Sequence, residues 1–346
     1  MGEKVKRAIF VAIVIGLPIL LVGLVYRWVD DKINGTISAI VDGKLGFASR
    51  QVADTVHNAA STSWIALAIG MGVLIILAGW LCNKEYFGAL IDQQNRYSLA
   101  RLQVAAWTTV VLSAWLAVVL VRIASDISVG NALKVEIPDA VLVTLGISVG
   151  SFAFSSGIKD SKRKQSVSPT FRVQLERDLQ TLTARVQQLT TDLAHSTAAA
   201  AVAAGDEKAA LDMAVSSLKV ELDARTVERD AITQQLEAIK SGEGLLAKNS
   251  SPADARASDF FRGDEIADAQ TLDFAKVQML WITVAVVAAY VFILSDALTG
   301  FDLFRGGSDG VSLPDLPDSV VALLAISHSG YLAVKASNSQ KPEGTP

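Results

Sequence analysis

Two stretches of this sequence match each other closely enough to predict that one two-helix membrane unit occurs twice in the chain. Self-similarity at a fixed offset is the signature of repeated structural units. At an offset of 175, Gly88, Ile91, Ala100, Gln103, Thr108, Val111 and Ala114 match Gly263, Ile266, Ala275, Gln278, Thr283, Val286 and Ala289. At an offset of 179, Pro138, Asp139, Val141, Leu145, Ile147 and Ser148 match Pro317, Asp318, Val320, Leu324, Ile326 and Ser327. We therefore expect an internal duplication.

Hydrophobic residues make up 51% of the chain, and this composition requires an environment that covers apolar surface. Five stretches without a charged side chain are about as long as the ~20 residues that cross a bilayer as a helix. They are 8–26, 64–82, 102–121, 140–158 and 277–295. A sixth stretch, 320–334, is shorter, but it aligns with the fourth stretch in the duplication. The sequence predicts an all-α integral membrane protein with six transmembrane helices in three hairpins.

Basic residues in the short flanks of these stretches predict the orientation. Three basic residues between positions 4 and 7 precede the first stretch, and four between positions 159 and 164 follow the fourth. Because lysine and arginine in short flanks stay in the cytoplasm, we expect both termini there. The expected location is a bacterial inner membrane or an equivalent plasma membrane.

A polar segment rich in alanine, leucine and charge lies between the two repeats. Its apolar residues are spaced alternately by four and three, which is typical of helices that pack side by side. The first series is Leu175, Leu179, Leu182, Val186, Leu189 and Leu193, and the second runs from Leu211 to Ile239 with arginines at 225 and 229. Gly205 is the expected turn. The pattern predicts a cytoplasmic antiparallel coiled-coil hairpin, which pairs either within the chain or between chains.

These patterns divide the chain into four parts. Residues 1–84 form an N-terminal transmembrane hairpin with a long outer segment, and residues 85–160 form the first membrane repeat. The cytoplasmic hairpin occupies residues 161–252, and the second membrane repeat occupies residues 253–346.

The duplication preserves polar residues in the expected spans, where lipid penalises an unpaired polar group. We expect Gln103 and Gln278 to hydrogen-bond across helices within the bundle. The alternative is a pore, lined by polar side chains of both repeats. The candidate residues for either role are Gln103, Thr108, Ser148, Gln278, Thr283, Ser327 and His328.

Matching residues also flank the third and fifth spans. Ser98 and Asp273 are of types that cap helix N-termini. Basic and aromatic residues in the following turns are expected to anchor both helices at the membrane interface. These anchors are Arg101, Trp107, Lys276 and Trp281.

The sequence from Gly146 to Gly150 has the Gly-x-Ser-x-Gly spacing of hydrolase nucleophile elbows. An elbow needs a strand, a turn and a helix in succession, whereas this pentad lies within an apolar helix. Its counterpart in the second repeat keeps only the small-x-x-x-small spacing, which lets membrane helices approach closely. We therefore expect Gly146, Gly150, Ala325 and Ser329 to serve helix packing.

His328 is the only histidine in an expected span, and ionisable groups within membranes are functional candidates. Val149 occupies the matching site in the first repeat, so the duplication does not preserve the histidine. The favoured interpretation is a neutral, hydrogen-bonded packing residue.

The sequence contains no pattern that indicates a metal site, a cofactor or a catalytic centre, and its net charge of -4 gives no reason to expect nucleic acid. We expect a non-enzymatic, oligomeric membrane scaffold that couples its transmembrane bundle to the cytoplasmic hairpin. Its partners would be the lipid bilayer, further copies of the chain and a cytoplasmic protein bound by the coiled coil. An ion channel or pore is the alternative, and a membrane-embedded enzyme ranks third.

Overall fold

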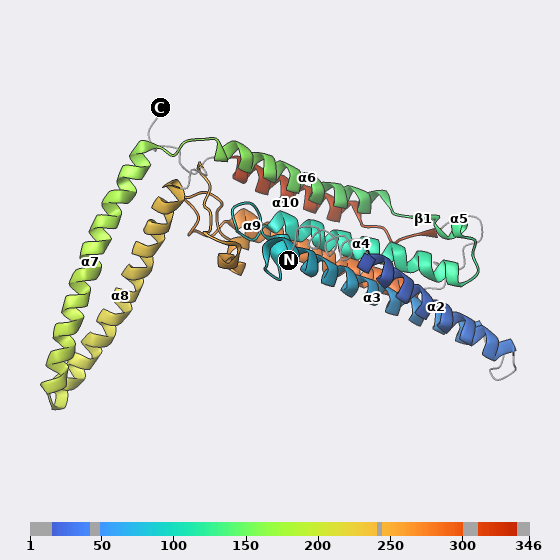
Figure 1. Ribbon diagram of the computed structural model, residues 1–346, viewed down its shortest axis with the longest axis horizontal. Helices are drawn as coiled ribbons and strands as arrows, with labels where there is room; N and C mark the ends of the chain where they lie inside the picture. The colour runs from blue at the N-terminus through green and yellow to red at the C-terminus, as the bar shows by residue number, and fades with distance from the viewer. Residues whose placement is uncertain (1–15, 42–48, 241–243, 300–310, 338–346) are drawn as a thin grey trace, which may run out of the picture. The chain divides into compact units, whose positions relative to one another are not determined.

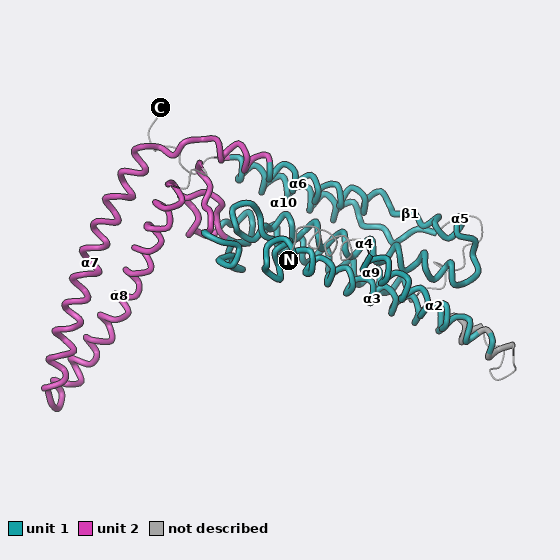
Figure 2. Tube along the Cα trace, viewed as in Figure 1, with its two compact units in different colours: residues 1–156, 250–261, 273–336 teal, residues 157–249, 262–272, 337–346 magenta. Residues whose placement is uncertain are grey.

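The computed structural model describes residues 16–41, 49–240, 244–299 and 311–337, and it divides into two compact units (Figure 2). The first, called the membrane unit, contains the described residues of 1–156, 250–261 and 273–336. The second, called the hairpin unit, contains the described residues of 157–249, 262–272 and 337–346.

Six long helices, a short one and two paired strands make up most of the membrane unit (Figure 1). The helices are α2 (Leu17–Val41), α3 (Ser49–Asn83), α4 (Leu99–Ala124), α5 (Val129–Ala132), α6 (Asp139–Arg163), α9 (Phe274–Thr299) and α10 (Asp318–Ala336). Three single 3-10 turns, at Gly88–Leu90, Pro252–Asp254 and Ala257–Phe260, lie in the connections. The last residues of α6, from 157 onward, belong to the hairpin unit.

Among the described residues, five helices are long and apolar enough to cross a membrane, as expected of an all-α membrane protein. These segments are Asn58–Asn83, Leu99–Ala124, Asp139–Arg163, Phe274–Leu298 and Asp318–Ala336. The first predicted span, 8–26, begins outside the described residues. Its described part belongs to α2, which continues through Asp30, Asp31 and Lys32 to Val41.

The described part of the outer segment between the first two predicted spans is helical and continuous with its neighbours. α2 extends beyond the first predicted span, and α3 begins at Ser49, well before the second. Val29, Ile33 and Val56 are buried in the main apolar core. These three residues therefore pack in the core of the membrane unit.

The core of the membrane unit is built around α4, whose residues are buried along much of its length. Trp107 of α4 is fully buried, and its ring centroid lies 5.9 Å from that of Tyr290 on α9. Leu67 of α3 and Leu294 of α9 pack in the same cluster. Because lipid is as apolar as these side chains, their close packing, and not their removal from water, stabilises the contacts between the spans.

Two short strands join the halves of the membrane unit at one end. β1 (Val135–Glu136) pairs in parallel with β2 (Val311–Ser312). The indole Nε1 of Trp115 donates to the carbonyl oxygen of Val135 over 3.1 Å, and the hydroxyl of Tyr290 donates to that of Pro314 over 3.1 Å. An aromatic side chain thus connects α4 to β1, and another connects α9 to the segment that follows β2.

The hairpin unit contains two long helices that lie side by side (Figure 1), α7 (Pro169–Val202) and α8 (Gly205–Lys240). Only Ala203 and Ala204 connect them, so the helices run antiparallel. Gly205 has a φ of +63°, a conformation that favours glycine. Its predicted place at the turn is confirmed, although it begins α8 instead of ending α7. At 1.5 Å per residue each helix is about 50 Å long.

The predicted apolar series faces the partner helix. Leu175 and Leu189 are buried, and the remaining members of both series are buried or half-buried. Arg185 of α7 donates to Glu221 of α8 over 2.8 Å, one ion pair across the hairpin. Arg225 and Arg229 pair with Glu228 and Asp230 on their own helix.

Candidate functional site

A row of hydroxyl side chains runs along the buried face of α6. Thr144, Ser148, Ser151 and Ser155 are spaced by four, three and four residues, which places them on one helix face. All four are at most 3% exposed. At 1.5 Å per residue the row covers about 16 Å of the helix axis. α6 therefore buries polar groups within a candidate membrane span.

α10 supplies the facing side chains, and we call the combined row the polar seam. The Oγ of Ser151 and the Nδ1 of His328 lie 2.6 Å apart and share a hydrogen bond. The hydroxyls of Ser155 and Tyr331 lie 3.4 Å apart, and the Nζ of Lys335 donates to the Tyr331 hydroxyl over 2.8 Å. The α10 members of the seam are Ser327, His328, Tyr331 and Lys335, all buried.

Several polar atoms of the seam lack a hydrogen-bond partner among the described residues. They are the Nε2 of His328, the Oγ of Ser327 and the Oγ1 of Thr144. A buried polar group without a partner costs about 1–3 kcal/mol, and in lipid no water compensates for it. Between α6 and α10 the seam therefore keeps hydrogen-bonding groups that no described residue satisfies.

The predicted pairing of Gln103 with Gln278 is wrong. The Nε2 of Gln103 donates instead to the Oγ1 of Thr283 over 2.6 Å, and both residues are buried. Gln278 is exposed on the surface of α9. Thr283 lies five residues after Gln278, so the rotation of α9 that brings Thr283 to α4 turns Gln278 outward.

Of the other predicted polar residues, Ser148, Ser327 and His328 meet in the seam, whereas Thr108 is half-buried elsewhere on α4. Ser148 of the Gly-x-Ser-x-Gly pentad lies inside the continuous helix α6. A nucleophile elbow is thus absent at this position. The histidine bonds to Ser151, one turn further along.

The predicted helix packing at small residues is not found within the chain. A Cβ atom added to Gly146 or Gly150 would meet no atom within 4 Å in the described structure. Ser329 is exposed and Ala325 is half-buried. The polar face of α6 packs inward, so these positions are left on the outside of the single chain.

The predicted interface anchors differ from one another. Trp107 is fully buried and Lys276 is 4% exposed, so neither side chain points outward toward a membrane interface, and their anchoring role stays a prediction. Arg101 is half-buried and donates to the carbonyl oxygen of Ala89 over 3.2 Å. Trp281 is exposed, as an anchor would be.

The two predicted helix caps also differ. The carboxylate of Asp273 accepts hydrogen bonds from the backbone N–H groups of Ala275 and Lys276, so this cap is confirmed. Ser98 makes no side-chain capping bond, and its predicted role is wrong. α4 begins at Leu99 nevertheless, since Leu102 N–H donates to the Ser98 carbonyl.

Sequence reasoning missed Ser151, Ser155, Tyr331 and Lys335, although the hydroxyl spacing along α6 was a usable signal. It also missed Arg122, a fully buried arginine at the end of α4. The Nη2 of Arg122 donates to the carbonyl oxygen of Asn131 over 3.0 Å. Its Nε and Nη1 have no hydrogen-bond partner among the described residues.

A second cluster lies where α6 ends, within the hairpin unit, and we call it the hairpin base. Lys162 forms a buried ion pair with Glu265 and donates to the carbonyl oxygen of Ser337 over 2.6 Å. The Nζ of Lys159 lies 3.6 Å from the Oδ1 of Asp264. The Nε2 of Gln235 on α8 donates to the carbonyl oxygen of Ile266 over 2.7 Å.

Gly244 completes the hairpin base. It has a φ of +65°, and a Cβ at this position would collide with the backbone carbonyls of Lys162 and Arg163. The chain leaving α8 thus packs directly on the backbone of α6.

Comparison of this chain with protein-family models, curated proteins and solved structures finds no match.

Proposed function

We propose that this chain is a non-enzymatic, oligomeric membrane scaffold that couples its transmembrane helices to the cytoplasmic hairpin. The hairpin base carries the proposal. Within one compact unit it joins the long hairpin to the end of α6 and to the residues that lead into α9. A hairpin that merely spaced two membrane segments would need no buried ion pair there. A force on the hairpin, such as the binding of a cytoplasmic protein, would therefore act on two spans.

We expect Leu189→Asp to loosen the hairpin base, although Leu189 lies in the middle of α7. Leu189 is 1% exposed, and a carboxylate buried there opens the contact between α7 and α8. Amide hydrogen exchange of the full chain should rise about tenfold or more at 157–163 and 262–272, as expected of a cooperative unit.

The matched control is Val220→Asp, because Val220 on α8 is 69% exposed. It should leave exchange at the hairpin base unchanged. If Leu189→Asp raises exchange only inside α7 and α8, the hairpin is a spacer and the coupling proposal fails. Light scattering on the same samples reports whether the chain is a homo-oligomer.

The outer face of α6 supports the proposed self-association. Gly146, Ala153 and Gly157 are exposed on the single chain, and exposed small residues allow membrane helices to approach closely. The cytoplasmic position of the hairpin and of both termini follows from the basic flanks, and it is part of the proposal.

We also infer that the two membrane repeats, 85–160 and 253–346, arose by duplication. α4 and α9 each contain 26 residues, and α9 begins 175 residues after α4. α10 begins at Asp318, 179 residues after the start of α6 at Asp139. Trp115 and Tyr290 also correspond at the first offset, and the carbonyls of Val135 and Pro314 that they bind correspond at the second. Equivalent residues making equivalent bonds support a repeated unit.

The polar seam favours a second candidate function, proton conduction between α6 and α10. Hydroxyl groups and a histidine in sequence can relay protons through a membrane protein. Two hydrogen-bonded groups, Ser151 with His328 and Ser155 with Tyr331 and Lys335, follow one another along the seam. Under the proposed orientation they extend from the middle of the spans toward the cytoplasmic ends.

If the seam conducts, Ser151→Val should reduce proton flux into liposomes about tenfold, because the His328 ring loses its hydrogen-bonded neighbour. A pH-sensitive dye inside the liposomes measures the flux. Ser156→Val is the control, since Ser156 is exposed on the same helix and bonds only to the carbonyl of Phe152. Flux that is no greater than that of protein-free liposomes excludes conduction.

A further inference from the structure

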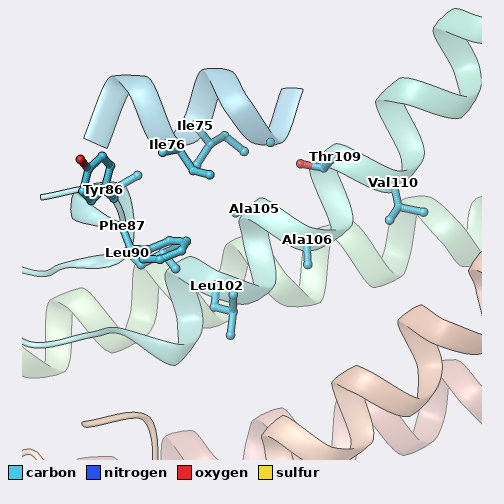
Figure 3. Close-up of a pocket in the computed structure, with 12 residues that line it drawn as sticks. Ile75, Ile76, Tyr86, Phe87, Leu90, Leu102, Ala105, Ala106, Thr109 and Val110 are labelled. Atoms are coloured by element: carbon cyan, nitrogen blue, oxygen red, sulfur yellow. The ribbon is translucent and has the colours of Figure 1, made fainter. Parts of the chain in front are cut away.

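An apolar groove of about 280 Å³ lies between α3 and α4 (Figure 3). The inference drawn from it does not depend on the proposed scaffold function. Ile75 and Ile76 line it from α3, and Ala105 and Ala106 line it from α4. Both sets lie within candidate membrane spans. The space exists because small residues occupy the walls. A Cβ added to Gly72, which also lines the groove, would meet no atom within 4 Å.

The segment between the two helices closes one end of the groove. Tyr86 and Phe87 line this end, and both are more than half exposed. Gly79 of α3 contacts the backbone of Gly88 so closely that no Cβ would fit between them. The Nδ2 of Asn83 donates to the carbonyl oxygen of Gly88 over 2.7 Å. The closed end is thus held by backbone packing, which makes the groove preformed.

Basic groups accompany the closed end. Lys84 is exposed, precedes Tyr86 by two residues, and has its Nζ 4.9 Å from the centre of the Trp80 ring. Arg101 donates to the carbonyl oxygen of Ala89, a residue that lines the groove. The apolar groove suits an acyl chain, and the cations and the tyrosine at its closed end suit the anionic headgroup joined to that chain.

We infer that this groove binds one acyl chain of an anionic phospholipid, with the phosphate beside Lys84. The slot opens along two spans, so lipid reaches it from within the bilayer. Its closed end lies where α3 and α4 leave the membrane, at headgroup level. The preformed shape lowers the entropic cost of holding one chain.

The test uses the full chain in nanodiscs of phosphatidylcholine containing phosphatidylglycerol with a photoactivatable acyl chain. Cross-links should concentrate on the residues of the groove. Gly72→Leu adds a side chain to the groove at a position where the Cβ meets no atom within 4 Å, and it should reduce these cross-links about tenfold, as loss of an apolar site predicts. Gly23→Leu is the matched control, because Gly23 is equally open on α2, and it should change nothing.

The headgroup is tested with Lys84→Gln. It should lower the preference of the groove for the phosphatidylglycerol probe over a phosphatidylcholine probe about threefold or more, because a single exposed charge contributes roughly 1 kcal/mol. Cross-links that survive Gly72→Leu, or that spread evenly over all lipid-facing helices, would overturn the inference. So would a fall in oligomer mass in Gly72→Leu, which would assign the groove to a second copy of the chain.

Discussion

Glu265→Gln is expected to destabilise the hairpin base by about 3–5 kcal/mol, because it leaves the ammonium of Lys162 buried without its counter-charge. Glu265 is 2% exposed and Lys162 is 5% exposed. Native-state hydrogen exchange at 157–163 measures the local opening free energy of the full chain.

A double substitution distinguishes the ion pair from simple packing. Lys162→Met with Glu265→Leu removes both charges, and replacing a buried pair by apolar residues is often close to neutral. We therefore expect the double variant to recover most of the loss, with a residual cost from the lost Lys162 bond to Ser337. Glu176→Gln breaks an exposed pair with Arg172 and should cost only ~0–1 kcal/mol. A double variant as unstable as Glu265→Gln would contradict the role assigned to the pair.

Gly79→Leu should be the most damaging single substitution in α3, at about 3 kcal/mol or more, because overpacking against backbone forces the main chain to move. The added side chain would collide with the backbone of Gly88 and Ala89. The measurement is the unfolding free energy of the detergent-solubilised chain, followed by tryptophan fluorescence.

Gly72→Leu on the same helix is the comparison. It has the same chemistry and helix propensity but meets open space, so it should cost less than about 1 kcal/mol. Leucine has a higher helix propensity than glycine, so propensity alone would stabilise both variants. Equal losses for the two variants would therefore show that the contact between α3 and the segment 84–90 does not determine the effect.

The positions of helices were predictable because they depend on short-range patterns. Apolar stretches long enough to cross a bilayer gave four of the candidate spans, alignment with the first repeat gave the fifth, and the alternating apolar spacing of the insertion gave α7 and α8. Asp273 was recognisable as a cap from its residue type and its place before an apolar run. These features depend on backbone hydrogen bonds and on residues a few positions apart.

The partners of the polar side chains were decided only by the tertiary structure. Gln103 and Thr283 are 180 residues apart, Ser151 and His328 are 177 apart, and Lys162 and Glu265 are 103 apart. Inside a membrane no hydrophobic force selects the face on which two helices meet. The rotation and depth of each helix follow from many weak packing contacts, and a turn of α9 by a fraction of a circle exposes Gln278 and buries Thr283. The sequence by itself therefore determined which segments are helices, whereas helix packing determined which of their polar groups meet.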